Sequence, residues 1–402
     1  MQLNHSLQLA YCTNIHRGET WGETFFSLQT FALAVREKVS PQKPFAIGLR
    51  LSERAASELS DRNTLLEFKR WLGKNTCYVF TINGFPYGQF HGERIKERVF
   101  RPDWTTPERV AYTNLLFNLL AELLPAGLEG SVSTLPGSFK EFYPSLEGLK
   151  TIRQNLWRSV EHVARISERT GRKLHLGLEP EPLCLLESSA ETVHLFDQLR
   201  AEHPRDERLA QHLGVNYDAC HFAVEFEEPQ NTLACLVSYG IKISKLHLSS
   251  ALKVSPTAEA REELKKFADD VYLHQVVERN EAGERNIYRD LPDALAFASQ
   301  QAVADDRPLP EWRIHFHVPL HAPAAPPFEN TNDHLLATLD WLAENPLLCA
   351  HLEMETYTWE VLPPELRSQD VVDQLAQEYD WTLAELAKRG LWDGTPGIAR
   401  PA

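Results

Sequence analysis

Short apolar segments recur along the chain, and longer stretches with helical spacing separate them. The segments predicted as β-strands are residues 7–13, 45–51, 77–82, 130–134, 173–179, 213–218, 243–248, 312–318 and 349–356. Most of their starts lie about 30–50 residues apart, which is the length of a strand, a loop, a helix and a return loop. The pattern therefore predicts repeated strand–helix units.

Helix signals fill the segments between these strands. Thr106 is typical of an N-cap residue, Pro107 of the first helical position and Glu108 of a first turn. Apolar residues at helical spacing follow: Tyr112, Leu115, Leu116, Leu119, Leu120 and Leu123. Comparable patterns predict helices over residues 61–72, 149–170 and 332–343, and a closing helix at about residues 367–390.

Repeated strand–helix units predict a parallel sheet, and two observations favour a closed barrel over an open sheet. No glycine-rich phosphate-binding loop follows an early strand. Polar residues recur instead at the carboxyl ends of many strands, where barrel enzymes keep their sites. We therefore predict an α/β protein with one domain over residues 1–402, a (β/α)8 TIM barrel. Nine candidate strands are one too many, and the extra strand lies either near the N-terminus or within residues 243–318.

The longest gap between predicted strands follows Ser250. Within it, residues 272–277 and 285–288 flank the turn-forming sequence Glu281-Ala282-Gly283-Glu284, which predicts a β-hairpin. We expect this hairpin to be an insertion at about residues 254–290, at the top of the barrel. It is either a lid or subunit contact, or a surface elaboration.

Composition and charge exclude several classes of protein. The 402 residues are 43% hydrophobic, which is enough for a large core. The net charge of −15 repels phosphate backbones, so we predict no nucleic-acid partner. No apolar run approaches the roughly 18 residues of a membrane span. The first residues do not resemble a secretory signal, and the six cysteines are widely spread, so we expect a cytoplasmic protein with reduced thiols.

One face of the late strands gathers carboxylates and imidazoles. Side chains alternate between the two faces of a strand, and the polar face of a barrel strand points to the barrel axis. Clustered carboxylates repel one another unless protons, basic partners or a bound dication relieve them. Three carboxylates and one imidazole suit Mn²⁺, Zn²⁺, Mg²⁺, Co²⁺ or Fe²⁺. We therefore predict a divalent metal site with the ligands Glu179, Asp218, His247 and Glu355.

Several neighbouring residues compete for roles at this site. His221, three residues after Asp218, is a further ligand or a hydrogen-bonding support for one. His317 is nearer the end of its strand than His315, and it is the rival of His247 as a ligand. Glu353 competes with Glu355, which is favoured because it lies further along the strand. The structural alternatives are a salt bridge for a glutamate, a helix cap for Asp218 and a hydrogen-bonded core position for His247.

Polar residues also end the early strands. The loop at residues 83–92 is long, aromatic and punctuated by glycine, and we expect it to close over a ligand at the barrel mouth. Its alternative is an irregular, well-packed loop. The predicted substrate-binding residues are Asn14, His16, Arg50, Asn83 and His91.

Six segments of the chain stand out as a set: AYCTNIH (10–16), FTINGFPYG (80–88), GLEPEP (177–182), NYDACH (216–221), HFHVP (315–319) and ETYTW (355–359). Together they resemble one family, the EboE metabolite traffic proteins. More broadly, the order Glu, Asp with a nearby His, His and Glu at late strand ends resembles the xylose-isomerase-like barrel superfamily. That superfamily contains sugar isomerases and epimerases and a branch of apurinic endonucleases.

The resemblance implies a fold, a metal site and a cellular setting. The fold is the xylose-isomerase-like barrel, and the superfamily's metal positions match Glu179, Asp218, His247 and Glu355. The setting is a bacterial gene cluster that processes or exports a secondary-metabolite precursor. The implied partners are a small-molecule metabolite and other proteins of the ebo cluster, including membrane components.

Three functions compete. The polar face favours a metal-dependent isomerase or epimerase of a sugar, polyol or keto compound, in which Glu179 and Glu355 pass a proton through an enediolate. The family resemblance and the aromatic loops favour a non-catalytic protein that binds a hydrophobic intermediate. A nuclease for damaged DNA is disfavoured by the charge of −15.

Overall fold

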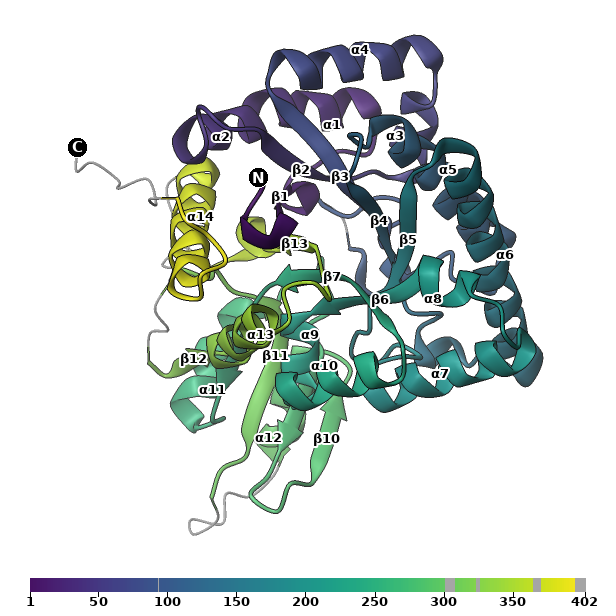
Figure 1. The fold of residues 1–402 in the computed structure, drawn as a ribbon. Coiled ribbons are helices and arrows are strands. Elements are labelled where there is room, and N and C mark those ends of the chain that lie inside the picture. Colours follow the sequence, from purple (N-terminus) through teal and green to yellow (C-terminus); the bar gives the residue numbers. More distant parts are fainter. Residues whose placement is uncertain (93, 301–307, 323–325, 364–369, 395–402) are drawn as a thin grey trace.

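Eight parallel strands close into a barrel, as predicted (Figure 1). The computed structural model describes residues 1–92, 94–300, 308–322, 326–363 and 370–394. Around the barrel the strands follow the order β1-β13-β7-β6-β5-β4-β3-β2. Their bounds are β1 Gln8–Cys12, β2 Phe45–Arg50, β3 Cys77–Asn83, β4 Glu129–Thr134, β5 Lys173–Leu178, β6 Leu213–Asp218, β7 Lys242–Leu248 and β13 His351–Met354.

Helices follow the strands and cover the outside of the barrel (Figure 1). Their bounds are α1 Trp21–Ser27, α2 Leu33–Val39, α3 Glu53–Leu59, α4 Arg62–Lys74, α5 Pro107–Leu123, α6 Leu146–Thr170, α7 Ser189–Glu202, α8 Arg208–His212, α9 Ala219–Val224, α10 Pro229–Ser238, α13 Asn332–Glu344 and α14 Val371–Lys388. The predicted closing helix is α14, and residues 367–369 of its predicted range lie outside the described residues.

Local signals explain where two of the long helices begin and end. Thr106 occupies the N-cap position of α5, but its hydroxyl donates to the carbonyl oxygen of Asp103 and caps no helical N–H group. Ser145 caps α6 by accepting from the backbone N–H group of Gly148 at 3.1 Å, so α6 begins three residues before the predicted start. Gly171 ends α6 with φ +67°, a conformation that glycine adopts without strain.

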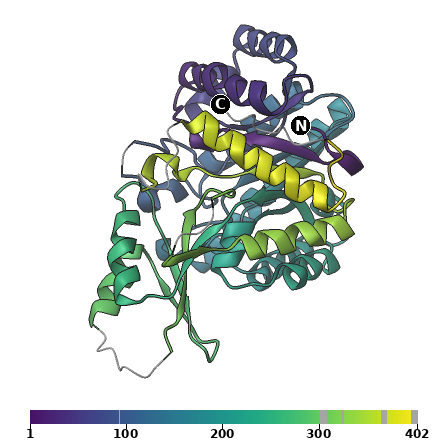
Figure 2. The same cartoon turned by 90° about the vertical axis from the view of Figure 1, so that its left-hand side faces the viewer.

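The chain leaves the barrel after β7 and builds a second, antiparallel sheet before α13. The order of this sheet is β10-β9-β11-β8-β12. Its strands are β8 Ala251–Val254, β9 Val276–Arg279, β10 Arg285–Tyr288, β11 Glu311–His317 and β12 Phe328–Asn330. Two further helices, α11 Ala258–Leu264 and α12 Leu291–Gln300, belong to the same excursion. It projects from the barrel in both views (Figures 1 and 2).

The extra predicted strand is β11, which belongs to this second sheet. It pairs antiparallel with β8 and β9, and Trp312, Ile314 and Phe316 pack into a small apolar core of the insertion. The predicted hairpin is the antiparallel pair β9 and β10. It is one part of an insertion that extends from β8 to β12, well beyond residues 254–290.

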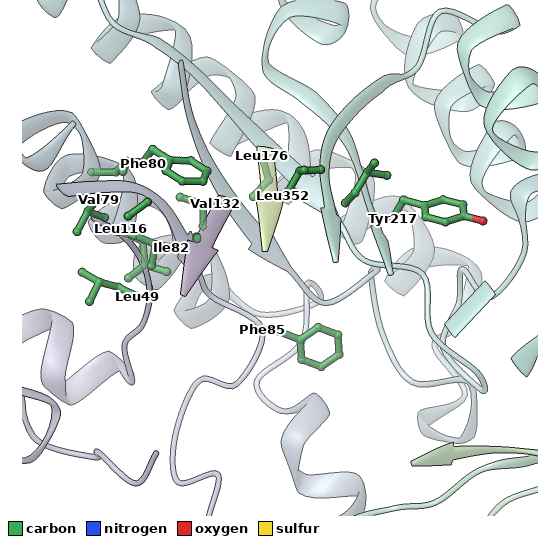
Figure 3. Packing of buried hydrophobic residues seen from close by; sticks show 14 of the residues in the cluster. Leu49, Val79, Phe80, Ile82, Phe85, Leu116, Val132, Leu176, Tyr217 and Leu352 are labelled. Atoms are coloured by element: carbon green, nitrogen blue, oxygen red, sulfur yellow. The ribbon is translucent and has the colours of Figure 1, made fainter. Parts of the chain in front are cut away.

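The main core lies between the barrel strands and their helices. Figure 3 shows apolar side chains from several barrel strands, among them Val79, Val132 and Leu176, together with Leu116 of α5. The closing helix α14 packs against α2, which brings the two ends of the chain's fold together (Figure 2). Among the described helices, none combines the length and the apolar character needed to cross a membrane.

Candidate metal centre

Strand register brings the predicted ligands to one mouth of the barrel. Asp218, the last residue of β6, lies opposite His247 of β7, and His247 lies opposite Glu353 of β13. Glu355 follows β13 directly, and Glu179 follows β5. All of these residues stand at the carboxyl ends of parallel strands, where barrel enzymes bind their substrates.

Glu179, Asp218, His247 and Glu355 converge on one point. One donor atom from each of the four lies within 4.8 Å of the others. His247 is central, because its Nδ1 atom lies 3.2 Å from Glu179 Oε1, 3.3 Å from Asp218 Oδ2 and 2.5 Å from Glu355 Oε2. All four side chains are buried.

The hydrogen bonding of this group fits a divalent cation. Glu179 Oε2 and Asp218 Oδ2 are buried and have no hydrogen-bond donor. A buried carboxylate oxygen without a partner is costly, and a dication would satisfy both at once. Three carboxylates and one imidazole nitrogen also form a donor set that Mn²⁺, Co²⁺, Zn²⁺ or Mg²⁺ accepts.

Neighbouring polar groups hold two of the carboxylates in place. Asp218 Oδ1 caps α9 by accepting from the His221 N–H group at 3.1 Å, and it accepts from the Ser249 hydroxyl at 2.7 Å. Glu355 Oε1 accepts from the amides of Asn14 at 2.5 Å and Asn83 at 3.4 Å. In each case one oxygen is fixed by the protein and the other faces His247. Such supporting bonds orient metal ligands.

Glu353 supports His247 from below the centre. Its Oε2 accepts from His247 Nε2 at 3.1 Å and pairs with Lys245, and all three side chains are buried. A donated Nε2–H leaves the Nδ1 lone pair for the carboxylate side of the ring. Gly48 makes room for Glu353, since a Cβ atom at position 48 would overlap Glu353 Oε1. The two glutamates that compete in sequence thus occupy two levels of the same face.

Glu353→Gln is expected to weaken Mn²⁺ binding about 10–100-fold, the usual effect of removing a support of a metal-bound histidine. The amide can still accept from His247, but it no longer neutralises Lys245. Isothermal titration calorimetry of the wild-type and variant proteins measures the change. Glu129→Gln, at the opposite end of the barrel, is the matched control with an expected ratio near one. Equal affinities in all three proteins would contradict a supporting role for Glu353.

Burial and mutual charge shift the pKa values of the cluster. Burial opposes a charge on His247, but Glu355 and Glu179 outweigh it and raise the pKa of its imidazole well above 6.5. Burial raises the pKa of Glu355 to about 8. Burial also disfavours the ionised form of Asp218, but His221 and a hydrogen bond from His247 lower its pKa well below 3.8. A protonated His247 therefore balances the neighbouring carboxylates, and it would have to release this proton to bind a metal ion.

Two more histidines flank Asp218. His221 Nδ1 donates to Pro180 O at 2.9 Å, and His317 Nδ1 donates to Glu355 O at 2.8 Å. The neutral His317 ring therefore has an Nε2 lone pair, and this atom has no hydrogen-bond partner. Burial lowers the pKa of His317 to about 4, which keeps its ring neutral. Asp218, His221 and His317 form a second group of donor atoms within 4.8 Å of one another.

The predicted substrate-binding residues divide into two sets. Asn14 and Asn83 line a cavity at the barrel mouth, together with Glu179 and Glu355. In the described part of the chain, His16, Arg50 and His91 are not among the residues that line it. His16 bonds to the Tyr11 hydroxyl and stacks on Phe31. Arg50 donates to the carbonyl oxygens of Gly18 and Gly88, and His91 Nε2 donates to Asn14 O at 2.6 Å. These three residues fix the loops around the mouth.

Other residues of the cavity were not predicted from the sequence. The cavity is also lined by Glu181, Lys96, Phe100, Tyr272 and Leu273. Tyr272 and Leu273 come from the insertion, so no spacing in the sequence relates them to the barrel strands. Glu181 is the one residue of this group that the sequence could have indicated. It lies two residues after Glu179, and side chains two residues apart on an extended chain point to the same side.

No protein-family model and no curated protein sequence matches the chain. Solved structures match its fold. A xylose isomerase-like TIM barrel protein from Mycobacterium smegmatis in complex with magnesium aligns over 97% of this chain and 99% of its own, with 12% identity and a TM-score of 0.52. An L-ribulose 3-epimerase aligns over 97% and 96%, with 10% identity and a TM-score of 0.50. The chain therefore has the fold of the xylose-isomerase-like TIM barrels.

Proposed function

We propose that this protein is a divalent-metal-dependent isomerase or epimerase of a small hydroxy-carbonyl compound. The observation that carries the proposal is the convergence of Glu179, Asp218, His247 and Glu355 on one point, with two buried carboxylate oxygens lacking a partner. The fold is compatible with this activity, since an L-ribulose 3-epimerase shares it.

In this proposal the four converging side chains bind the metal, and two of them, Glu179 and Glu355, also transfer a proton. The metal would be held by Glu179, Asp218, Glu355 and Nδ1 of His247, and it would polarise two adjacent substrate oxygens and acidify the C–H bond beside them. Asn14 and Asn83 hold Glu355 Oε1, which fixes that carboxylate against the cavity floor. Glu179 also lines the cavity and keeps Oε2 without a donor. Glu179 and Glu355 are therefore the pair that removes the proton from one carbon atom and returns it.

The resemblance to the EboE family adds a cellular setting to this proposal. In that setting the protein processes a secondary-metabolite precursor in the cytoplasm, and proteins of the ebo cluster, including membrane components, take over the product. The setting stays a prediction, because it rests on the resemblance of the six segments alone. A non-catalytic binding role is the second candidate, and the largely apolar upper part of the cavity favours it.

Proton exchange at carbon tests the proposed reaction. The Mn²⁺-loaded protein is incubated in D₂O with dihydroxyacetone, L-ribulose or 2-hydroxyacetophenone, and mass spectrometry measures deuterium incorporation. We expect exchange with at least one compound, a fall of at least about 100-fold in Glu179→Gln, and no change in Glu129→Gln. Mn²⁺ binding without exchange of any of the three would reject the isomerase in favour of the binding role. Absence of Mn²⁺ binding would reject the metal centre itself.

A further inference from the structure

The cavity above the metal centre has two chemically different halves. Its lower end is made by Asn14, Asn83, Glu179, His221 and Glu355. The rest of its lining is mainly apolar, with Phe85, Phe90, Phe100, Tyr272, Leu273 and Tyr357, and it also includes Glu181, Lys96 and His315. Figure 3 shows Phe85 beyond the arrowheads of the barrel strands, apart from the other labelled core side chains. A ligand that fills this cavity therefore contacts apolar side chains as well as the polar groups at the strand ends.

Three of these side chains form a continuous aromatic wall, which we define as Phe90, Tyr272 and Tyr357. Their ring centroids lie 5.4 Å apart for Phe90 and Tyr272, 5.3 Å for Phe90 and Tyr357 and 5.4 Å for Tyr272 and Tyr357. The rings come from the loop after β3, the insertion and the segment after β13. Mutual packing of three aromatic rings fixes the shape of this wall.

The polar atoms of the aromatic wall already have partners. The Tyr272 hydroxyl bonds to Nδ1 of His91, whose Nε2 donates to Asn14 O. The Tyr357 hydroxyl lies 3.4 Å from His315 Nε2. The hydroxyl groups of a free sugar would lose water at this wall and gain few hydrogen bonds in return. An apolar ring loses nothing there.

The cavity also offers no free cation in the part of the chain that the structure describes. Lys96 is the only lysine or arginine among the described lining residues. Its Nζ atom lies 2.6 Å from Asp290 Oδ2 and 2.9 Å from Asp269 O, so its charge is neutralised by the insertion. A phosphate or carboxylate on the far end of a ligand would therefore find no counter-charge.

We infer that the ligand of this cavity is an uncharged molecule in which two adjacent oxygens bind at the metal centre and a flat apolar ring packs on the aromatic wall. This inference rests on the proposed function, because the metal centre anchors the oxygens. It assigns substrate choice to Phe90, Tyr272 and Tyr357. It separates this protein from an enzyme whose pocket hydrogen-bonds an open-chain sugar or a sugar phosphate.

Two hydroxamates with the same chelating head test the inference. Benzohydroxamate carries a phenyl ring and acetohydroxamate a methyl group, and each presents two adjacent oxygens to a metal. Both are titrated into the Co²⁺-loaded protein, and the visible absorption of Co²⁺ reports their binding at the metal. We expect benzohydroxamate to bind about 10–100-fold more tightly, the scale set by burying a phenyl ring. The same titration of Co²⁺ with a small chelating peptide corrects for the intrinsic difference between the two heads.

Variants of the wall residue Phe90 and of the neighbouring apolar lining residue Leu273 complete the test. In Phe90→Ala and in Leu273→Ser we expect the ratio of the two affinities to fall at least fivefold. The affinity of acetohydroxamate reports in each variant whether the metal centre has survived. Equal affinities of the two hydroxamates in the wild-type protein would overturn the inference and leave the metal centre standing. If Co²⁺ binds to the protein but neither hydroxamate alters its absorption, the inference falls as well; if Co²⁺ does not bind, the proposed function falls with it.

Discussion

The Asp218→Asn variant is expected to lose the stabilisation that a divalent cation gives the wild-type protein. Asp218 Oδ2 faces His247 without a hydrogen-bond donor, whereas Oδ1 caps α9 and accepts from Ser249. Asparagine keeps an oxygen for the cap and for Ser249, so the fold is preserved. It replaces Oδ2 by an amide group that cannot coordinate a cation. The substitution therefore removes a ligand with little other change.

Thermal unfolding with and without Mn²⁺ measures this effect. A cation at 100 times its Kd stabilises the folded state by about 2.7 kcal/mol, and at 1,000 times its Kd by about 4.1 kcal/mol. We expect this gain in the wild-type protein and in Glu129→Gln, and no gain in Asp218→Asn at the same Mn²⁺ concentration. A shift of the same size in Asp218→Asn would mean that the cation binds elsewhere on the molecule.

The second large effect concerns Glu378, a buried acid on α14. Its Oε2 accepts from the Thr356 hydroxyl at 3.0 Å, and its Oε1 has no partner. Burial raises the pKa of this carboxyl to about 8. Between the ordinary pKa of about 4.5 and this value, the folded chain holds a proton that the unfolded chain has released. The contribution of Glu378 to stability therefore falls as the pH rises, by about 1.4 kcal/mol per pH unit across that window.

Glu378→Gln is accordingly expected to be more stable than the wild-type protein at pH 8, by about 3–5 kcal/mol, and close to it at pH 4.5. The midpoint of urea unfolding, measured from pH 4.5 to 8.5, follows the difference. Glu385→Gln on the same helix is the control. Partial burial opposes the charge on Glu385, but hydrogen bonds from Lys388 and Arg389 outweigh it and lower its pKa. The substitution Glu385→Gln should therefore lower the free energy of unfolding most at neutral pH, where Glu385 is ionised. Parallel pH profiles for wild type and Glu378→Gln would contradict the prediction.

The barrel was predictable because each of its strands carries its own signal. Buried parallel strands are short apolar runs, and their spacing reflects the helices between them. The second sheet was predictable only in part. In β11, Trp312, Ile314 and Phe316 alternate with polar residues. Such alternation predicts a strand with one buried face, but it does not indicate which sheet the strand joins. The partners of β11 are β8 and β9, which precede it across helices and a hairpin, so neither spacing nor period could assign it.

The convergence of Glu179, Asp218, His247 and Glu355 was predictable from the sequence, whereas their heights relative to Glu353 along the barrel axis were not. Glu353 and Glu355 share a face of β13 and its extension, so the sequence makes them rivals. The strand register places Glu353 opposite His247, and Glu355 lies two residues further along the chain, on the same face. One therefore supports the imidazole and the other faces Asn14. Tyr272 lies at the cavity because the insertion folds back over the barrel mouth, and no local sequence pattern predicts that arrangement.

The insertion has a small apolar core of its own, although Leu273 and Leu320 of the insertion pack into the barrel core. Tyr272 and Leu273 of the upper cavity belong to the insertion, whereas the predicted ligands belong to the barrel and its strand ends. Exchange of the part of the insertion that carries Tyr272 and Leu273 would therefore change the upper cavity while Glu179, Asp218, His247 and Glu355 stay on the barrel. For protein engineers, exchanging that part between related barrels is a route to new specificity if Ser249 and His317, which contact Asp218 and Glu355, are kept.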